Sequence, residues 1–150
     1  MISYNDIVSQ IQANIGPGLT YNFSVTQIDL AADIESVMAN EVKMDNSIHV
    51  IPIEEPANPN GSSNLVISRV APKIGILMGV KNMYDAIGGE EVQDSAKTLR
   101  EYVASTLQGY TPSGATIPMA FMGSKLVRYQ DGVAWYLDIY EAGYNIREVV

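Results

Sequence analysis

The sequence contains no cysteine, only one histidine and few basic residues, and each shortage excludes a class of function. Without cysteine the chain forms no disulfide, holds no metal through thiolates and has no cysteine nucleophile. The one histidine, His49, makes a zinc site only if carboxylates supply every other ligand. Nine lysines and arginines against seventeen acids give a net charge of −8 without a basic cluster, which argues against tight binding along a nucleic-acid backbone.

Enzyme motifs and long apolar runs are missing as well. The sequence has no Gly-x-Ser-x-Gly elbow, no Gly-x-x-x-x-Gly-Lys loop and no Gly-x-Gly-x-x-Gly fingerprint. Its adjacent glutamates at 54–55 and 90–91 are chain neighbours, whereas catalytic carboxylates face each other across about 5–10 Å. The longest uncharged apolar run, around residues 74–80, is far too short to span a membrane. We therefore expect no enzyme, no cofactor and no metal site, with His49 a structural or surface residue.

The residues that are present predict one globular domain over 1–150 with helices and a sheet. Hydrophobic residues make up 47% and charged residues 17%, which is a globular composition. Ile7, Ile11 and Ile15 recur every four residues and predict a helix over 3–15 that Ser3 caps. The further elements are expected as a short strand within 19–25, a helix at about 28–40, a strand at 48–53 with Pro52 near an edge, an exposed loop at 54–64, strand-like residues 65–80 broken near Pro72, a helix at 90–108, and strands within 115–145. This order predicts an α+β fold: a mixed, mainly antiparallel sheet with two or three helices packed on one face.

The stretch KLVRYQDGVAWYLDIYEAGY, residues 125–144, predicts a hairpin whose two faces are both rich in apolar or aromatic side chains. Asp131-Gly132 favours a two-residue turn, and uninterrupted pairing from it ends with Lys125 opposite Asp138, a favourable pair of opposite charges. One face then carries Leu126, Arg128, Val133, Trp135, Leu137 and Ile139, and the other carries Val127, Tyr129, Ala134, Tyr136 and Tyr140. We expect the first face, with Trp135, to be core. The tyrosine face either meets another protein or coats an exposed sheet.

Several stretches together resemble a known family. They are an N-terminal amphipathic helix that ends in glycine, the strand and loop IHVIPIEEPANPNG, the strand RVAPKIGILMGVKN, the helix DSAKTLREYVASTLQGY and the closing FMGSKLVRYQDGVAWYLDIYEAGY. In this layout the chain resembles the tail terminator family of long-tailed bacteriophages, especially the Mu-like contractile-tail branch. The resemblance covers most of the chain.

The resemblance implies a structural protein of the virion tail and neck, assembled in the host cytoplasm. Members of the family would form a ring, usually a hexamer, on the last ring of the tail tube, stop tube polymerisation and join the tail to the neck or head connector. In a contractile tail the ring would also meet the sheath. DNA would only pass through the lumen, which an acidic subunit suits, and no membrane is involved.

Partner contacts are expected at the loop and at the hairpin. The interface candidates are Glu54, Glu55, Asn58, Asn60, Arg128, Tyr129, Gln130, Asp131, Tyr136 and Tyr140. Two other functions remain open at this point. The chain could be another neck or tail-completion protein or a tail tube subunit, or, in a different class, a small soluble protein-binding module.

Overall fold

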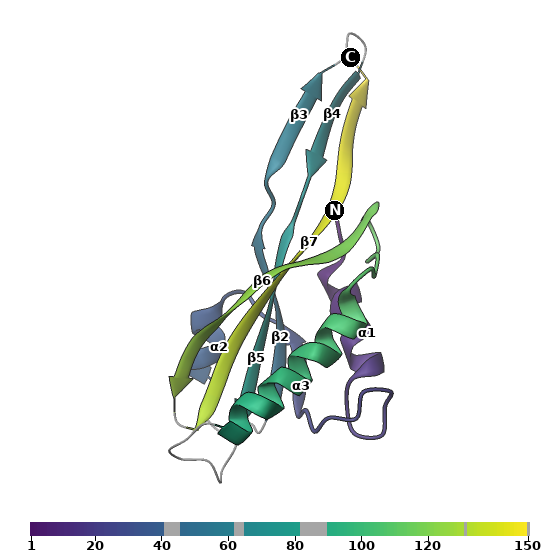
Figure 1. Cartoon of the computed structure of the whole chain (residues 1–150). Helices are drawn as coiled ribbons and strands as arrows, with labels where there is room; N and C mark the ends of the chain where they lie inside the picture. Colours follow the sequence, from purple (N-terminus) through teal and green to yellow (C-terminus); the bar gives the residue numbers. More distant parts are fainter. Residues whose placement is uncertain (41–45, 62–64, 82–89, 131, 150) are drawn as a thin grey trace.

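One twisted sheet of seven strands organises the fold (Figure 1). The computed structural model describes residues 1–40, 46–61, 65–81, 90–130 and 132–149. The strands are β1 (Gln27–Leu30), β2 (Asn46–Glu54), β3 (Ala57–Gly61), β4 (Leu65–Val70), β5 (Lys73–Lys81), β6 (Ile117–Gln130) and β7 (Val133–Val149), and the helices are α1 (Tyr4–Asn14), α2 (Ile34–Asn40) and α3 (Glu90–Leu107). The order is β1-β2-β5-β7-β4-β3, with β6 paired to β7 outside this path. The β1–β2 pair is parallel and every other pair is antiparallel, so the predicted α+β fold is confirmed.

The long strand β7 connects the two halves of the sheet. Its first part, Val133 to Glu141, lies between β5 and β6, and its last part, Tyr144 to Val149, pairs with β4. The β3–β4 hairpin and the end of β7 together extend past the helices as a three-stranded projection, here called the β-arm (Figure 1). The sheet therefore has a body that helices cover and an arm that they do not.

Alternation along the strands divides the body into two cores on opposite faces of the sheet. On the face called the front, Ile74, Ile76 and Met78 of β5 pack with α1 and α3. On the back, Leu77 packs with Trp135 and α2. Two helices thus share the front, as predicted, and the short helix α2 covers part of the back. Helices of the same chain therefore cover at least part of both faces of the hairpin.

The segment before β2 differs from the prediction. The predicted helix at about 28–40 is only correct from Ile34, because residues 27–30 form β1 beside β2 and Asp33 caps α2 by accepting the Ser36 N–H at 2.7 Å. The short strand expected within 19–25 is wrong, since a single bridge between Ile15 and Tyr21 is what the described residues show there. The secondary structure of this segment thus depends on pairing with the neighbouring strand and not on helical spacing within it.

The predicted loop at 54–64 is also wrong, because most of its described residues continue the sheet. After Glu54 the chain enters β3, which pairs with β4 and contains Pro59. Proline is compatible with this place because β3 is the last strand of the sheet on its side. Pro52 obeys the same rule: β1 ends opposite Val50, so β2 is an edge strand where Pro52 stands.

The register of the β6–β7 hairpin is correct near the turn and wrong beyond it. Gln130, Tyr129 and Arg128 pair with Val133, Ala134 and Trp135 as expected. An irregularity between Leu126 and Arg128 then shifts the register, so Leu126 lies opposite Tyr136 and Lys125 opposite Leu137. The expected Lys125–Asp138 pair is therefore absent, because an extra residue in one strand displaces every partner after it.

Trp135 is part of the back core, as the sequence predicted. It is 3% exposed, and its ring lies so close to Gly79 that a Cβ there would be 2.8 Å from it.

We predict that Trp135→Ala lowers the free energy of unfolding by about 3–5 kcal/mol, because it leaves a cavity under α2. Urea denaturation measures this loss. Met122→Ala, at a side chain that is 56% exposed, is the control and should cost less than about 1 kcal/mol. Equal losses in the two variants would contradict the assignment of Trp135 to the core.

Candidate interaction surfaces

The single histidine is engaged in structural contacts. His49 is 2% exposed, its Nδ1 lies 2.5 Å from Asp29 Oδ1, and its ring packs 6.3 Å from that of Trp135. In the described ranges, no group of three or more His, Asp or Glu side chains is placed to hold a metal ion. No helix within the same ranges is long and apolar enough to cross a membrane. The surfaces of the molecule are therefore the candidates for function.

Two tyrosines of the hairpin, Tyr136 and Tyr140, belong to the front core. Tyr140 is fully buried, and burial, with the nearby Asp138 as a smaller cause, raises the pKa of its phenol. Tyr136 is half-buried beneath Arg100, whose guanidinium lies 5.3 Å from the ring centroid. Tyr140, one of the predicted interface residues, is therefore a core residue of this chain and has no surface left for a second chain. An interface at Tyr129 and Tyr136 stays a prediction.

An ion pair fixes α3 on the hairpin. Arg100 Nε donates to Asp138 Oδ1 at 3.1 Å, and the same guanidinium donates to Ser124 Oγ on β6. The Asp138 side chain is 3% exposed, and burial raises the pKa of its carboxyl against the opposing effect of Arg100. One arginine thus links α3, β6 and β7.

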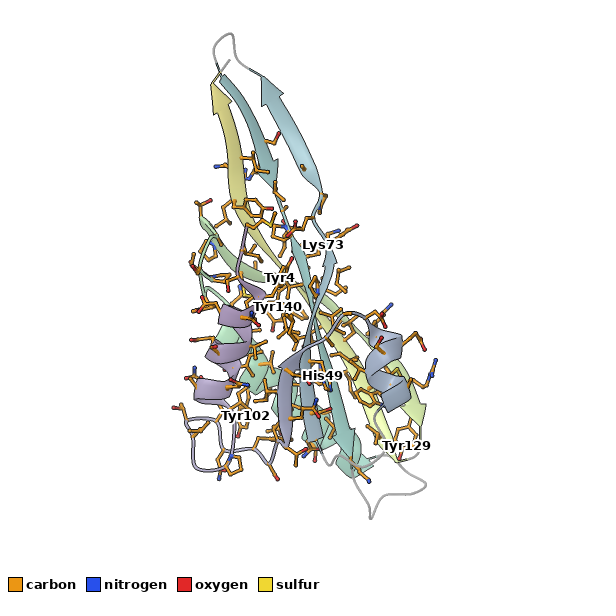
Figure 2. The ribbon with its side chains drawn as sticks, turned by 180° about the vertical axis from the view of Figure 1, so that it is seen from behind. Tyr4, His49, Lys73, Tyr102, Tyr129 and Tyr140 are labelled. Carbon is orange, nitrogen blue, oxygen red and sulfur yellow. The ribbon has the colours of Figure 1, made fainter. Side chains whose placement is uncertain are left out.

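At the base of the β-arm, Glu55 joins three elements. Its carboxylate accepts the Tyr4 hydroxyl of α1 at 3.0 Å and the Tyr144 hydroxyl of β7 at 3.4 Å. Burial and this carboxylate raise the pKa of both phenols, which therefore remain donors. The preceding Glu54 forms a separate ion pair with Lys73 at 3.0 Å. Figure 2 shows Tyr4 and Lys73 close to this base. Glu55 therefore helps to fix the arm to the body.

The other predicted contact residues lie on the arm and at the end of the hairpin. Asn58 and Asn60 belong to β3, opposite Arg69 and Ile67 of β4. Arg128 and Tyr129 are exposed near the hairpin end, and Figure 2 places Tyr129 far from Tyr140 and from the arm base. Gln130 pairs with Val133, and Asp131 lies outside the described residues. The structure thus separates the candidates into an arm group and a hairpin group.

Strand β6 exposes an apolar surface that the sequence analysis missed. Four of the nine exposed large hydrophobic residues found in the described ranges lie on it, and they are called the β6 strip: Phe121 (45%), Met122 (56%), Leu126 (55%) and Tyr129 (45%). The loop after α3 covers the start of the strand, where Met119 donates to the Tyr110 carbonyl and Phe121 donates to the Gln108 side chain. Beyond Phe121, β7 is the only strand in the described part of the chain that pairs with β6. One feature of the sequence indicated that this strand reaches the surface: residues 117–130 include two bases and no acid.

A groove on the back of the sheet was missed as well. It has a volume of about 670 Å³ and lies between the start of α2, the end of β2 and one residue of β6. This α2 groove is lined by Ala32, Asp33, Ile34, Glu35, Ile51, Pro52, Ile53 and Val127. Ile53 is 41% exposed, while Asp33 and Glu35 are exposed acids. The groove is therefore apolar and has acids at one side.

The two glutamates at the arm base allow a matched test. We predict that Glu55→Ala lowers the free energy of unfolding by about 1–2 kcal/mol, because two hydroxyls lose a charged acceptor at a partly exposed site. Glu54→Ala removes an exposed ion pair and should cost less than about 0.5 kcal/mol. Urea denaturation of both variants measures the difference. An effect of Glu54→Ala as large as that of Glu55→Ala would contradict the role given to Glu55.

Comparison with known proteins agrees with a role in a virion. No match was found among curated proteins. Among solved structures, a chain from "Virion of native gene transfer agent (GTA) particle" is similar in fold, with a TM-score of 0.51, 13% sequence identity, and coverage of 97% of this chain and 96% of that one. The family described as "Phage tail terminator protein" matches residues 19–149. Because this match spans most of the sequence, the chain belongs to the phage tail terminator family and is a structural component of a virion tail.

Proposed function

We propose that this protein forms a ring at the end of the tail tube, stops tube polymerisation and joins the tail to the neck or head connector. The observation that carries the proposal is the family match over residues 19–149, because members of this family are tail-completion proteins. The earlier resemblance to the Mu-like branch adds the expectation of a hexamer and, for a contractile tail, of a contact with the sheath. The net charge of −8 suits a lumen through which DNA passes without binding.

The shape of the chain supports a ring subunit. A closed ring needs two different patches on each subunit, and the β6 strip and the α2 groove are two such surfaces. The β-arm supplies a third surface, which extends past the helices (Figure 1). In this arrangement the body contacts neighbouring subunits, and the arm, with Asn58 and Asn60, contacts the tube or the connector.

A capping experiment tests the function directly. We predict that adding the protein to polymerising tube subunits of the same phage gives shorter tubes, each with a ring at one end, in negative-stain electron microscopy. Tubes of unchanged length would contradict capping. Copolymerisation along the whole tube would instead identify a tube subunit. An unrelated acidic protein at the same concentration is the control for charge effects.

A further inference from the structure

We propose that the later part of β6 accepts an extended strand from a different protein, in which acidic and apolar side chains alternate. The surface is the open side of β6 from Gly123 to Leu126, here called the β6 edge. Along these residues β7 is the one strand that pairs with β6 in the described part of the chain, so the other side of β6 has its backbone available for a further ladder. The inference goes beyond the proposed ring and does not depend on it.

The other edges of the sheet are obstructed. Helix α1 lies against β1, and its Gln12 side chain donates to the Ile28 carbonyl at 2.9 Å. Pro52 stands where β2 becomes an edge and Pro59 stands in β3, and neither residue has an N–H to donate to an added strand. The loop after α3 covers the beginning of β6. Among the described strands, the later part of β6 is therefore the edge without such an obstruction.

The side chains of the β6 edge differ between the two faces of the sheet. Leu126 lies opposite Tyr136 and therefore on the front, where it is 55% exposed. Lys125 is exposed on the back, opposite the apolar Leu137, and residues 117–130 contain no acid. An added strand therefore fits this edge best with an apolar side chain beside Leu126 and a carboxylate beside Lys125. Successive residues of a strand point to opposite faces, so an alternating sequence provides both.

The charge of β6 favours a different protein over a second copy of this chain. Among its described strands, a second folded copy offers one edge without obstruction, and that edge is again β6. Pairing of β6 with β6 brings together two basic strands that have no acid, and like charges oppose that arrangement. An acidic strand meets no such opposition, and its charges also select the register of the pairing. The partner therefore supplies a strand in which acidic and apolar residues alternate.

The irregular pairing of β6 limits the length of the added strand. The register shifts between Phe121 and Gly123 and again between Leu126 and Arg128, so the regular stretch between these places is residues 123–126. Irregularities of this kind twist an edge and interrupt a long ladder. A short strand that pairs with residues 123–126 tolerates them. Such a strand lies beside β6 and not over its front, so the front of the β6 strip stays available in the proposed ring.

Hydrogen–deuterium exchange of the full chain tests strand addition. The probe is a short blocked peptide in which glutamate and valine alternate, added in excess. We expect slower amide exchange in residues 123–126, because hydrogen bonds to an added strand protect edge N–H groups. A fully N-methylated version of the peptide keeps the side chains, but its methyl groups obstruct a backbone ladder, so it should give no protection. No protection by the unmodified peptide, or equal protection by both peptides, would overturn the inference.

A charge exchange tests the choice of partner. Lys125→Glu should weaken binding of the glutamate–valine peptide by about two- to fivefold and strengthen binding of a lysine–valine peptide, because the charge pair across the strands is reversed. Lys97→Glu, on α3, changes the net charge equally and should alter neither affinity. Titration of each peptide, followed by the same exchange measurement, gives the affinities. An unchanged preference in Lys125→Glu would contradict the acidic partner.

The outcomes also separate this inference from the proposed ring. Capped tubes with rings at their ends, together with unprotected residues 123–126, leave the ring standing and show that the strand addition is wrong. Protection of residues 123–126 without capping or rings supports the strand addition and contradicts the ring.

Discussion

The structure depends on the pairing of β7 with three other strands. Its first part holds β5 and β6 on its two sides, and its last part holds β4, so the body and the arm share one continuous strand of 17 residues. The same strand supplies Tyr140 to the front core and Trp135 to the back core. Because β7 is common to all these contacts, the positions of the arm, the β6 strip and the α2 groove are fixed relative to one another.

Local signals predicted the elements that local interactions determine. The isoleucine period and the Ser3 cap predicted α1, and the helix predicted at 90–108 is α3, which Gly109 follows with a φ of 80°. β1 was missed because it forms by pairing with β2, which is not adjacent to it in the sequence. β3 was missed because its Pro and Asn residues are poor strand formers except at an edge. The hairpin turn could be predicted from Asp131-Gly132, but no residue type indicates the irregularity near Val127 that shifts the register.

The interaction surfaces were harder to predict because exposure depends on where helices end. The alternation of the hairpin identified the two faces of β7 correctly, but the irregularity in β6 exchanges two residues of the prediction. Leu126 lies opposite Tyr136, and Val127 packs with the back core. Arg100 of α3 binds Asp138 and lies over the Tyr136 ring. Tyr140 is fully buried, whereas Leu126 is 55% exposed. The packing of α3 therefore separates the aromatic and aliphatic residues that are core from those that stay at the surface.

The two outer edges of the sheet are protected differently, and this difference favours separate roles for them. The β3 edge carries Pro59, which lacks an N–H and blocks the addition of another strand. In β6 the proline, Pro118, stands at the beginning, where the loop after α3 already covers the strand. Basic residues and irregular pairing protect the later part of β6, which exposes Leu126 and Tyr129. An edge of this kind resists pairing with a second copy of itself. The arm, in contrast, is suited to contacts through its faces. This asymmetry agrees with the proposed ring, in which the body contacts neighbouring subunits and the arm contacts a different protein.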